Sequence, residues 1–329
     1  MAARAAACLV VCSILAALGA CGNGTSATTT SRTPSEYIDD ILGIMENNSL
    51  NRATINWADF RAQVTARAQG AQTILDLEPA ISLALGLLKD HHSFYKAASG
   101  RYVSSPNSRS CSAPPVAAPS IPADVGYVQV SGFVYTQPGS DVAFAEGVEN
   151  GIRSRDAPRL VGWIVDVRGN SGGDMWPMIA GVGSVLGDGV AGYFVPPLGE
   201  TSTPWGYRDG AAFNADNVAC RTSSPYVLMV PGPKVAVLTD GAVASAGEAV
   251  VVAFRARPNT RSFGGATCGD STANQGFSLS DGAMLYLTVA VMADRDLSAY
   301  GDSIVPDEVL SGDAPVVDRA IAWLRSKAE

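Results

Sequence analysis

Two adjacent histidines, His91 and His92, supply every imidazole group in the sequence. They follow a helix predicted over residues 74–88 and lie between Asp90 and Ser93. Imidazole is the usual general base near neutral pH, so a hydrolase that uses imidazole on this chain takes its base from this pair. Two plainer interpretations remain open. Cationic groups stabilise the C-terminal end of a helix, and histidines bind metals, although cysteine and carboxylate ligands at suitable spacing are absent here.

A serine, Ser245, stands between a buried strand predicted over residues 235–239 and a helix predicted over residues 247–257. Small residues fill the turn before it, which lets a substrate backbone approach closely. The free N–H groups at the start of the helix stabilise a developing oxyanion. Ser245 and Glu248 also have the spacing of a capping box, so the interpretation of Ser245 as a simple helix cap stays open.

A second buried strand, predicted over residues 161–167, ends in a turn rich in Gly and Asn. Two consecutive glycines, Gly172 and Gly173, allow unusual backbone angles and can aim N–H groups into a cleft. We expect Asp166 and Arg168 to brace the turn through an ion pair or hydrogen bonds. An ordinary turn at the end of a strand is the alternative interpretation.

The rest of the chain predicts the framework that positions these groups. Residues 36–97 are interpreted as a small helical module capped by Ser35, residues 98–124 as a loop or linker, and residues 125–329 as a domain of alternating strands and helices, with one strand expected at 226–230. A hydrophobic share of 47% and a charged share of 16% over 329 residues suit a compact α/β enzyme. The net charge is −8 and no Lys/Arg cluster stands out, so we expect no nucleic-acid partner.

The N-terminus predicts export. Arg4 and the apolar run of residues 5–18 have the form of a signal peptide, too short to predict a membrane span. Leu18-Gly19-Ala20-Cys21 resembles the lipobox of bacterial lipoproteins, which implies a signal peptide of residues 1–20 and a lipid on Cys21. The alternative is an ordinary signal peptide with a chance cysteine. Residues 21–35 then form a flexible tether, and we expect a protein that faces away from the cytoplasm and is attached to the cell membrane by its lipid only.

The remaining cysteines predict one disulfide. Cys111, Cys220 and Cys268 are left once the signal is removed and Cys21 carries lipid. In an oxidising compartment three cysteines give one disulfide and one free thiol. We expect the pair Cys111–Cys220, because both lie in loop-like sequence rich in Pro and Ser, with Cys268 as the alternative partner.

Taken together, the motifs resemble the tail-specific (C-terminal processing) serine proteases, whose relatives include the tricorn protease core and the repeats of interphotoreceptor retinoid-binding protein. The resemblance covers roughly residues 35–325 and depends on the order of several short motifs. These are Leu88-Lys89-Asp90-His91-His92-Ser93, Asp-x-Arg-x-Asn-x-Gly-Gly from Asp166, Ala-Ser-Ala-Gly-Glu around Ser245, Gly264-Gly265-Ala266-Thr267-Cys268-Gly269 and Val305-Pro306-Asp307. The first of them resembles the tricorn-like branch and places the family histidine on His92.

One departure from the family pattern concerns the base. Many tail-specific proteases use a Ser/Lys dyad, with Lys directly after the Thr-x-Gly motif, but Asp270 occupies that position here. No lysine of the mature chain matches a catalytic position of the family. The sequence also leaves no room for the PDZ domain common in the Ser/Lys branch. The resemblance therefore points to the branch that uses histidine.

The resemblance implies a ClpP/crotonase-like α/β core behind a small N-terminal helical module, and a serine peptidase that needs no cofactor or metal. His92 would deprotonate Ser245, and the N–H groups of Ala246 and of Gly172 or Gly173 would hold the oxyanion. An acidic residue near the C-terminal Pro-Asp segment would orient the base. Asp302 is the nearest candidate, with Asp307 and Glu308 behind it. Activity would rise with pH through an apparent pKa of about 6–7, because neutral imidazole is required.

Two other functions are weighed against a peptidase of envelope or extracellular proteins and peptides. The retinoid-binding relatives imply that the same fold can serve as a non-catalytic protein that binds an apolar ligand or a peptide. The presence of both His92 and Ser245 disfavours that alternative. An acyl-CoA enzyme of the crotonase type is disfavoured by the predicted export, because CoA is cytoplasmic.

Overall fold

A parallel sheet forms the centre of the computed structural model, which describes residues 32–116, 118–197 and 199–327. Its five strands lie in the order β13-β10-β9-β4-β3, and neighbouring strands run parallel. They are β3 (Gly126–Gln129), β4 (Trp163–Asp166), β9 (Val235–Thr239), β10 (Thr260–Gly264) and β13 (Glu308–Val309). Every residue of β4 and β9 is buried, as expected for parallel strands covered on both faces.

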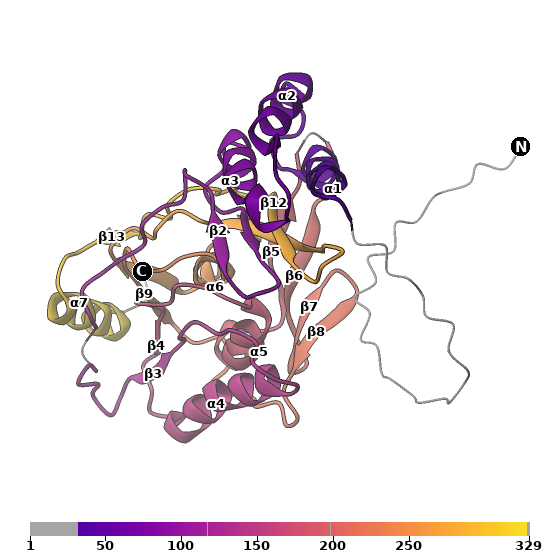
Figure 1. The fold of residues 1–329 in the computed structure, drawn as a ribbon. Coiled ribbons are helices and arrows are strands. Elements are labelled where there is room, and N and C mark those ends of the chain that lie inside the picture. Colours follow the sequence, from indigo (N-terminus) through magenta and orange to yellow (C-terminus); the bar gives the residue numbers. More distant parts are fainter. Residues whose placement is uncertain (1–31, 117, 198, 328–329) are drawn as a thin grey trace, which may run out of the picture. The chain divides into compact units, whose positions relative to one another are not determined.

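Helices cover the two faces of this sheet. On one face α4 (Ser140–Arg155), α5 (Met175–Leu186) and α6 (Ala246–Phe254) pack against Trp163 and Val165 of β4. On the other face α7 (Asp313–Arg325) packs against the intervening residue, Ile164. Figure 1 shows α7 apart from α4 and α5, with the strands between them. The alternation of side chains along a strand therefore divides the apolar run of β4 between two cores.

A second, largely antiparallel sheet of eight strands has the order β2-β1-β12-β5-β6-β7-β8, with β11 paired to β12. Its strands are β1 (Phe94–Lys96), β2 (Tyr102–Ser104), β5 (Gly189–Val195), β6 (Thr203–Arg208), β7 (Ala211–Asn214), β8 (Asn217–Arg221), β11 (Thr272–Ser278) and β12 (Met284–Asp294). Because β11 follows β10 closely in the chain, the segment between them leads from the parallel sheet to the second one.

The N-terminal helices are α1 (Pro34–Asn48), α2 (Trp57–Ala68), the 3₁₀ turn η1 (Leu75–Leu77) and α3 (Glu78–Leu87). Their buried side chains share one apolar core with Leu285 and Leu287 of β12, and Figure 1 shows the helices beside that strand. From Thr33 onward the described chain forms one compact unit. The predicted mixed α/β fold behind a helical module is confirmed.

Three local predictions differ from the structure. Thr33 rather than Ser35 caps α1, because Pro34 takes the first helical position and Glu36 completes a capping box with Thr33. The loop predicted over residues 98–124 contains strand β2. Residues 226–230 form no strand, and Val227 is 79% exposed, so this apolar run finds no sheet to join.

The signal peptide and nearly all of the predicted tether, including Cys21, lie outside the described residues. Among the helices of the described residues, none has the length and hydrophobicity of a membrane-spanning segment.

Candidate active site

The turns that follow β4, β9 and β10 meet at one edge of the parallel sheet, where the carboxyl ends of parallel strands lie together. The Ala244 N–H donates to the carbonyl of Asn170 over 3.0 Å, and the Cys268 N–H donates to the carbonyl of Val243 over 2.8 Å. Behind the first turn, Arg168 forms the predicted brace, with its guanidinium 2.7 Å from the buried Asp166 carboxylate. The structure thus brings the Ser245 turn, the Gly172–Gly173 turn and the Cys268 segment together.

Ser245 has a strained backbone. It lies immediately before α6 with φ 54° and ψ −117°, although it carries a side chain. A serine that only caps a helix takes an extended conformation with negative φ. Sparsely populated backbone conformations of this kind cost about 1–3 kcal/mol and gather at functional sites. A sharp, strained turn from strand to helix is also how α/β-hydrolases present a nucleophilic serine.

A buried carboxylate, Glu248, holds the backbone of this turn. It accepts from the Ser245 N–H over 2.9 Å, from the Thr267 hydroxyl over 2.5 Å and from the Gly269 N–H over 3.0 Å. Glu248 is fully buried, and this burial raises its pKa to about 7 against the opposing effect of the three hydrogen bonds. Glu248 therefore links the backbone of Ser245 to the segment after β10.

The two predicted oxyanion glycines differ in their hydrogen bonds. A Cβ added at Gly172 would lie 2.8 Å from the Ser245 Cβ and 3.3 Å from the Ala246 nitrogen, so Gly172 lies against the serine. However, the Gly172 N–H already donates to the side chain of Asn170 over 2.9 Å. Within the described residues the N–H of Gly173 has no such acceptor. Ala246 is the first residue of α6, where an N–H has no partner inside the helix.

His92 lies in the loop between α3 and β1, and three contacts hold it. Its backbone N–H donates to Asp90 Oδ1 over 3.0 Å, and its carbonyl accepts from the Asn274 side chain over 2.8 Å. Its ring atom Nδ1 lies 2.8 Å from the Thr272 hydroxyl. Burial lowers the pKa of His92 to about 4, well below the range of 6–7 predicted from the sequence.

The neighbouring His91 has different surroundings. Its ring is exposed, and Nδ1 lies 3.0 Å from the carbonyl of Asn107. Within the described residues no hydrogen bond joins either imidazole to Ser245. Hydrogen bonds between catalytic groups often form only once substrate is bound, so their absence here is compatible with His92 as a base.

The family of this chain follows from a comparison with family models. The model of peptidase family S41 matches residues 124–310, more than half of the sequence. The chain belongs to peptidase family S41. It is also 30% identical over 166 residues to the nisin-resistance protein of Lactococcus lactis subsp. lactis. That stretch is 50% of each chain, so the matched region spans about half the length of this relative.

Solved structures show the same fold over nearly the whole length. A lipoprotein from Streptococcus agalactiae is 21% identical, with a TM-score of 0.72 over 90% of this chain and 97% of that one. A peptidase-like protein from Parabacteroides merdae is 16% identical, with a TM-score of 0.60 over 91% and 98%. The photosystem II D1 C-terminal processing protease is 15% identical, with a TM-score of 0.51 over 88% and 97%. The resemblance to tail-specific proteases is confirmed.

In this S41 peptidase fold, the acidic residues predicted to orient the base contact other groups. Asp302, with a side chain that is 75% exposed, pairs with Arg109 over 2.7 Å. The Asp307 carboxylate accepts from Ser262 over 2.7 Å, and Glu308 pairs with Arg319. None of the three contacts the His92 ring in the described part of the chain. The ring contacts Thr272 instead. This contact could not be predicted, because nothing in Ser271-Thr272-Ala273-Asn274 distinguishes Thr272 from its neighbours.

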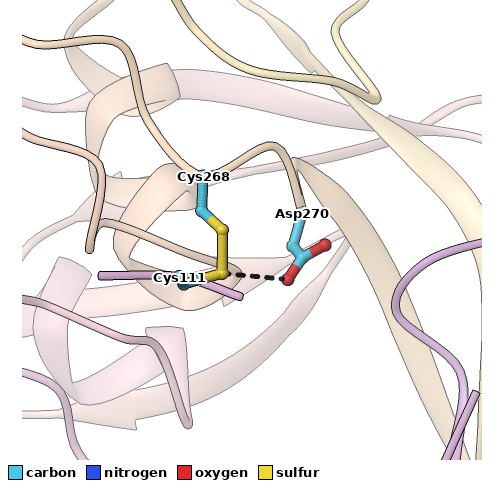
Figure 2. A group of neighbouring side chains, drawn as sticks. All are labelled: Cys111, Cys268 and Asp270. Carbon is cyan, nitrogen blue, oxygen red and sulfur yellow. Dashed lines mark hydrogen bonds between the residues drawn. A yellow bond between two sulfur atoms is a disulfide. The ribbon is translucent and has the colours of Figure 1, made fainter. Parts of the chain in front are cut away.

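The disulfide of the S41 chain joins Cys111 to Cys268, with 5.3 Å between their Cα atoms. The predicted pair Cys111–Cys220 is wrong, and the alternative partner is the correct one. Cys220 is a buried free thiol on β8, where it lies opposite Ala212 of β7 and packs into the core beneath α4 and α5. Figure 2 shows the disulfide beside Asp270, whose Oδ2 lies 3.9 Å from the Cys111 sulfur. Both sulfurs of this cluster are bonded to each other, so in this form they are not metal ligands.

Proposed function

We propose that the chain is an exported serine peptidase in which Ser245 is the nucleophile and His92 is the general base. Membership of family S41 supports a peptidase. The backbone of Ser245 carries the assignment of the nucleophile, because a simple helix cap has no need of a positive φ at a residue with a side chain.

The proposed reaction uses the groups described above. His92 takes the proton of the Ser245 hydroxyl as Oγ attacks the peptide carbonyl carbon, and the imidazolium then donates that proton to the leaving amine. The N–H of Ala246 and one glycine N–H hold the oxyanion. Gly173 is favoured over Gly172 for this role, because the Gly172 N–H is committed to Asn170. Loss of one such donor removes about 3–4 kcal/mol of transition-state stabilisation.

The low pKa of His92 suits a base that is uncharged before substrate binds. A neutral imidazole is the required form, and burial keeps it neutral well below pH 6. The same burial makes the ring a weaker base. The rate therefore depends more strongly on contacts that stabilise the imidazolium in the transition state.

Export and the lipid at Cys21 belong to the same proposal. The signal-like segment and the lipobox support them, and one structural relative is described as a lipoprotein. The expected substrates are peptides or proteins outside the cytoplasm. Because another relative is named a nisin-resistance protein, nisin belongs in a first substrate panel.

The decisive experiment labels the protein with a fluorophosphonate probe and maps the modified peptide. We expect the probe on Ser245 and no labelling of Ser245→Ala. Ser154→Ala, which changes an exposed serine on α4, is the matched control and should label like the wild type. A folded wild-type protein that neither reacts nor cleaves any peptide would favour the alternative of a non-catalytic binding protein.

A second experiment tests export. The mature protein should partition with membranes, and Cys21→Ser should release it or block processing. A wild-type protein that lacks an acyl group on Cys21 would contradict the lipid anchor while leaving the peptidase assignment intact.

A further inference from the structure

We propose that Thr272 is the positioning residue of His92, with its hydroxyl in the place that a carboxylate takes in Ser-His-Asp hydrolases. The inference rests on the proposed function, in which His92 is the base. The observation that supports it is the 2.8 Å contact between His92 Nδ1 and Thr272 Oγ1. In the Ser-His-Asp arrangement the group on Nδ1 holds the ring orientation and keeps the proton on that nitrogen.

Thr272 is well placed to fix a ring. It is the first residue of β11, only 8% exposed, and lies opposite Val291 of β12 in the sheet. Its backbone N–H donates to the Asp270 carbonyl over 2.7 Å. A β-branched side chain on such a strand has few accessible rotamers, so the direction of its hydroxyl is set by the backbone.

The remaining contacts of His92 come from the same group of elements. Asn274, two residues further along β11, donates to the His92 carbonyl and also accepts from the Thr288 hydroxyl of β12 over 2.9 Å. Two side chains of β11, Thr272 and Asn274, therefore hold the ring and the backbone of His92.

No carboxylate competes with Thr272 for the ring among the described residues. Asp90 accepts from the backbone N–H groups of His92 and Ser93 and from the Ser93 hydroxyl. Burial raises the pKa of Asp270, which lies before β11, and the charges of Arg109 and His91 oppose that rise. Asn274 and Thr288 are uncharged. The neutral hydroxyl of Thr272 is therefore the group that faces Nδ1.

A hydroxyl can accept or donate, and the two cases differ in function. If Oγ1 accepts, the proton lies on Nδ1 and the Nε2 lone pair is free to act as a base. If Oγ1 donates to Nδ1, the proton lies on Nε2 and the base is blocked. The proposal requires the first arrangement. It also predicts that a carboxylate at position 272 raises the pKa of His92, because a negative charge favours the imidazolium.

The test combines kinetics with nitrogen NMR on the full chain. Thr272→Val keeps the shape and removes the hydroxyl, Thr272→Ser keeps the hydroxyl, and Thr272→Asp adds a charge. Thr203→Val on β6 is the matched control for loss of a threonine hydroxyl on a strand. We expect Thr272→Val to lower kcat by at least tenfold with KM little changed, Thr272→Ser to recover most of the loss, and Thr272→Asp to move the acid limb of kcat/KM to higher pH.

The ¹⁵N-histidine spectrum is simple, because the sequence has two histidines. The single variants His91→Ala and His92→Ala each remove the signals of one ring, which assigns the signals of the other. We expect His92 to carry its proton on Nδ1 in the wild type and to lose this preference in Thr272→Val. A proton on Nε2 in the wild type overturns the inference, as does a Thr272→Val protein with unchanged kcat and spectrum. If Thr272→Val does not fold, the pH shift of Thr272→Asp decides, and an unmoved acid limb overturns the inference. Failure of the proposed function is a different result, in which His92→Ala keeps its kcat or Ser245 does not react.

Discussion

The strain at Ser245 can be measured by replacing it with glycine. Glycine adopts φ 54° and ψ −117° far more readily than a residue with a Cβ, so Ser245→Gly should relieve strain while abolishing activity. A relief of about 1–3 kcal/mol is offset by about 0.5–1 kcal/mol for the greater freedom of glycine in the unfolded chain. Ser245 and Glu248 also form a capping box at the start of α6, and loss of the serine from it removes a few tenths of a kcal/mol more. The expected net change is about 1 kcal/mol of added stability.

The assay is the free energy of unfolding in denaturant, together with the melting temperature. For a domain of this size about 1 kcal/mol corresponds to about 2 °C. Ser245→Ala keeps a Cβ in the strained conformation and loses the hydroxyl, so it should be less stable than the wild type. Thr33→Gly is the matched control, because Thr33 caps α1 with an ordinary extended backbone of φ −67° and ψ 155°, and it should lower stability. A Ser245→Gly protein that is destabilised like Thr33→Gly would show that Ser245 is an ordinary cap, and the argument from strain would fail.

Three further predictions concern the base and the disulfide. Because neutral imidazole is the active form, kcat/KM should be lost as the pH falls through the His92 pKa of about 4, so a profile with its acid limb near pH 6.5 would contradict the role of burial. His92→Ala should lower kcat by several orders of magnitude, whereas His91→Ala should be far milder because its ring is exposed and contacts Asn107; the reverse order in steady-state kinetics would move the base to His91. Replacing Cys111 and Cys268 by serine removes a disulfide that spans 157 residues of sequence. The chain-entropy model predicts that this lowers the free energy of unfolding by up to about 5 kcal/mol. An unchanged denaturation midpoint would show that the disulfide constrains the unfolded chain little.

The parts of the fold predicted from sequence are those whose signal is local. The apolar run at 161–167 and the strand at 235–239 indicated buried parallel strands, and such strands bring their carboxyl ends to one edge of a sheet. The turns of Gly172 and Ser245 could therefore be expected to meet. The strand predicted at 226–230 had the same local signal but no neighbour to pair with, which periodicity cannot reveal.

The parts that could not be predicted depend on pairing between distant segments. Thr272 reaches His92 across 180 positions of sequence, and it does so because β11 and β1 both pair with β12. The disulfide has the same origin. The segment after β10 brings Cys268 to Cys111 in the loop between β2 and β3, while β8 places Cys220 in the core beneath α4 and α5. Composition around each cysteine says nothing about these registers.

The segment between β10 and β11 joins the separate parts of the proposed site. Thr267 and Gly269 donate hydrogen bonds to Glu248, which accepts from the Ser245 N–H. Cys268 forms the disulfide with Cys111 in the loop between β2 and β3. Thr272 contacts the ring of His92. By family resemblance, the position of Asp270 is where the Ser/Lys branch carries its lysine. On that resemblance, the segment supplies the base itself in the Ser/Lys branch. In this chain it supplies Thr272, which we propose orients a base from the N-terminal part of the chain. Replacing Asp270 by lysine should nevertheless not restore activity to His92→Ala, because the side chain at position 270 lies against the Cys111–Cys268 disulfide, 3.9 Å from the Cys111 sulfur, and within the described residues it has no hydrogen bond to Ser245.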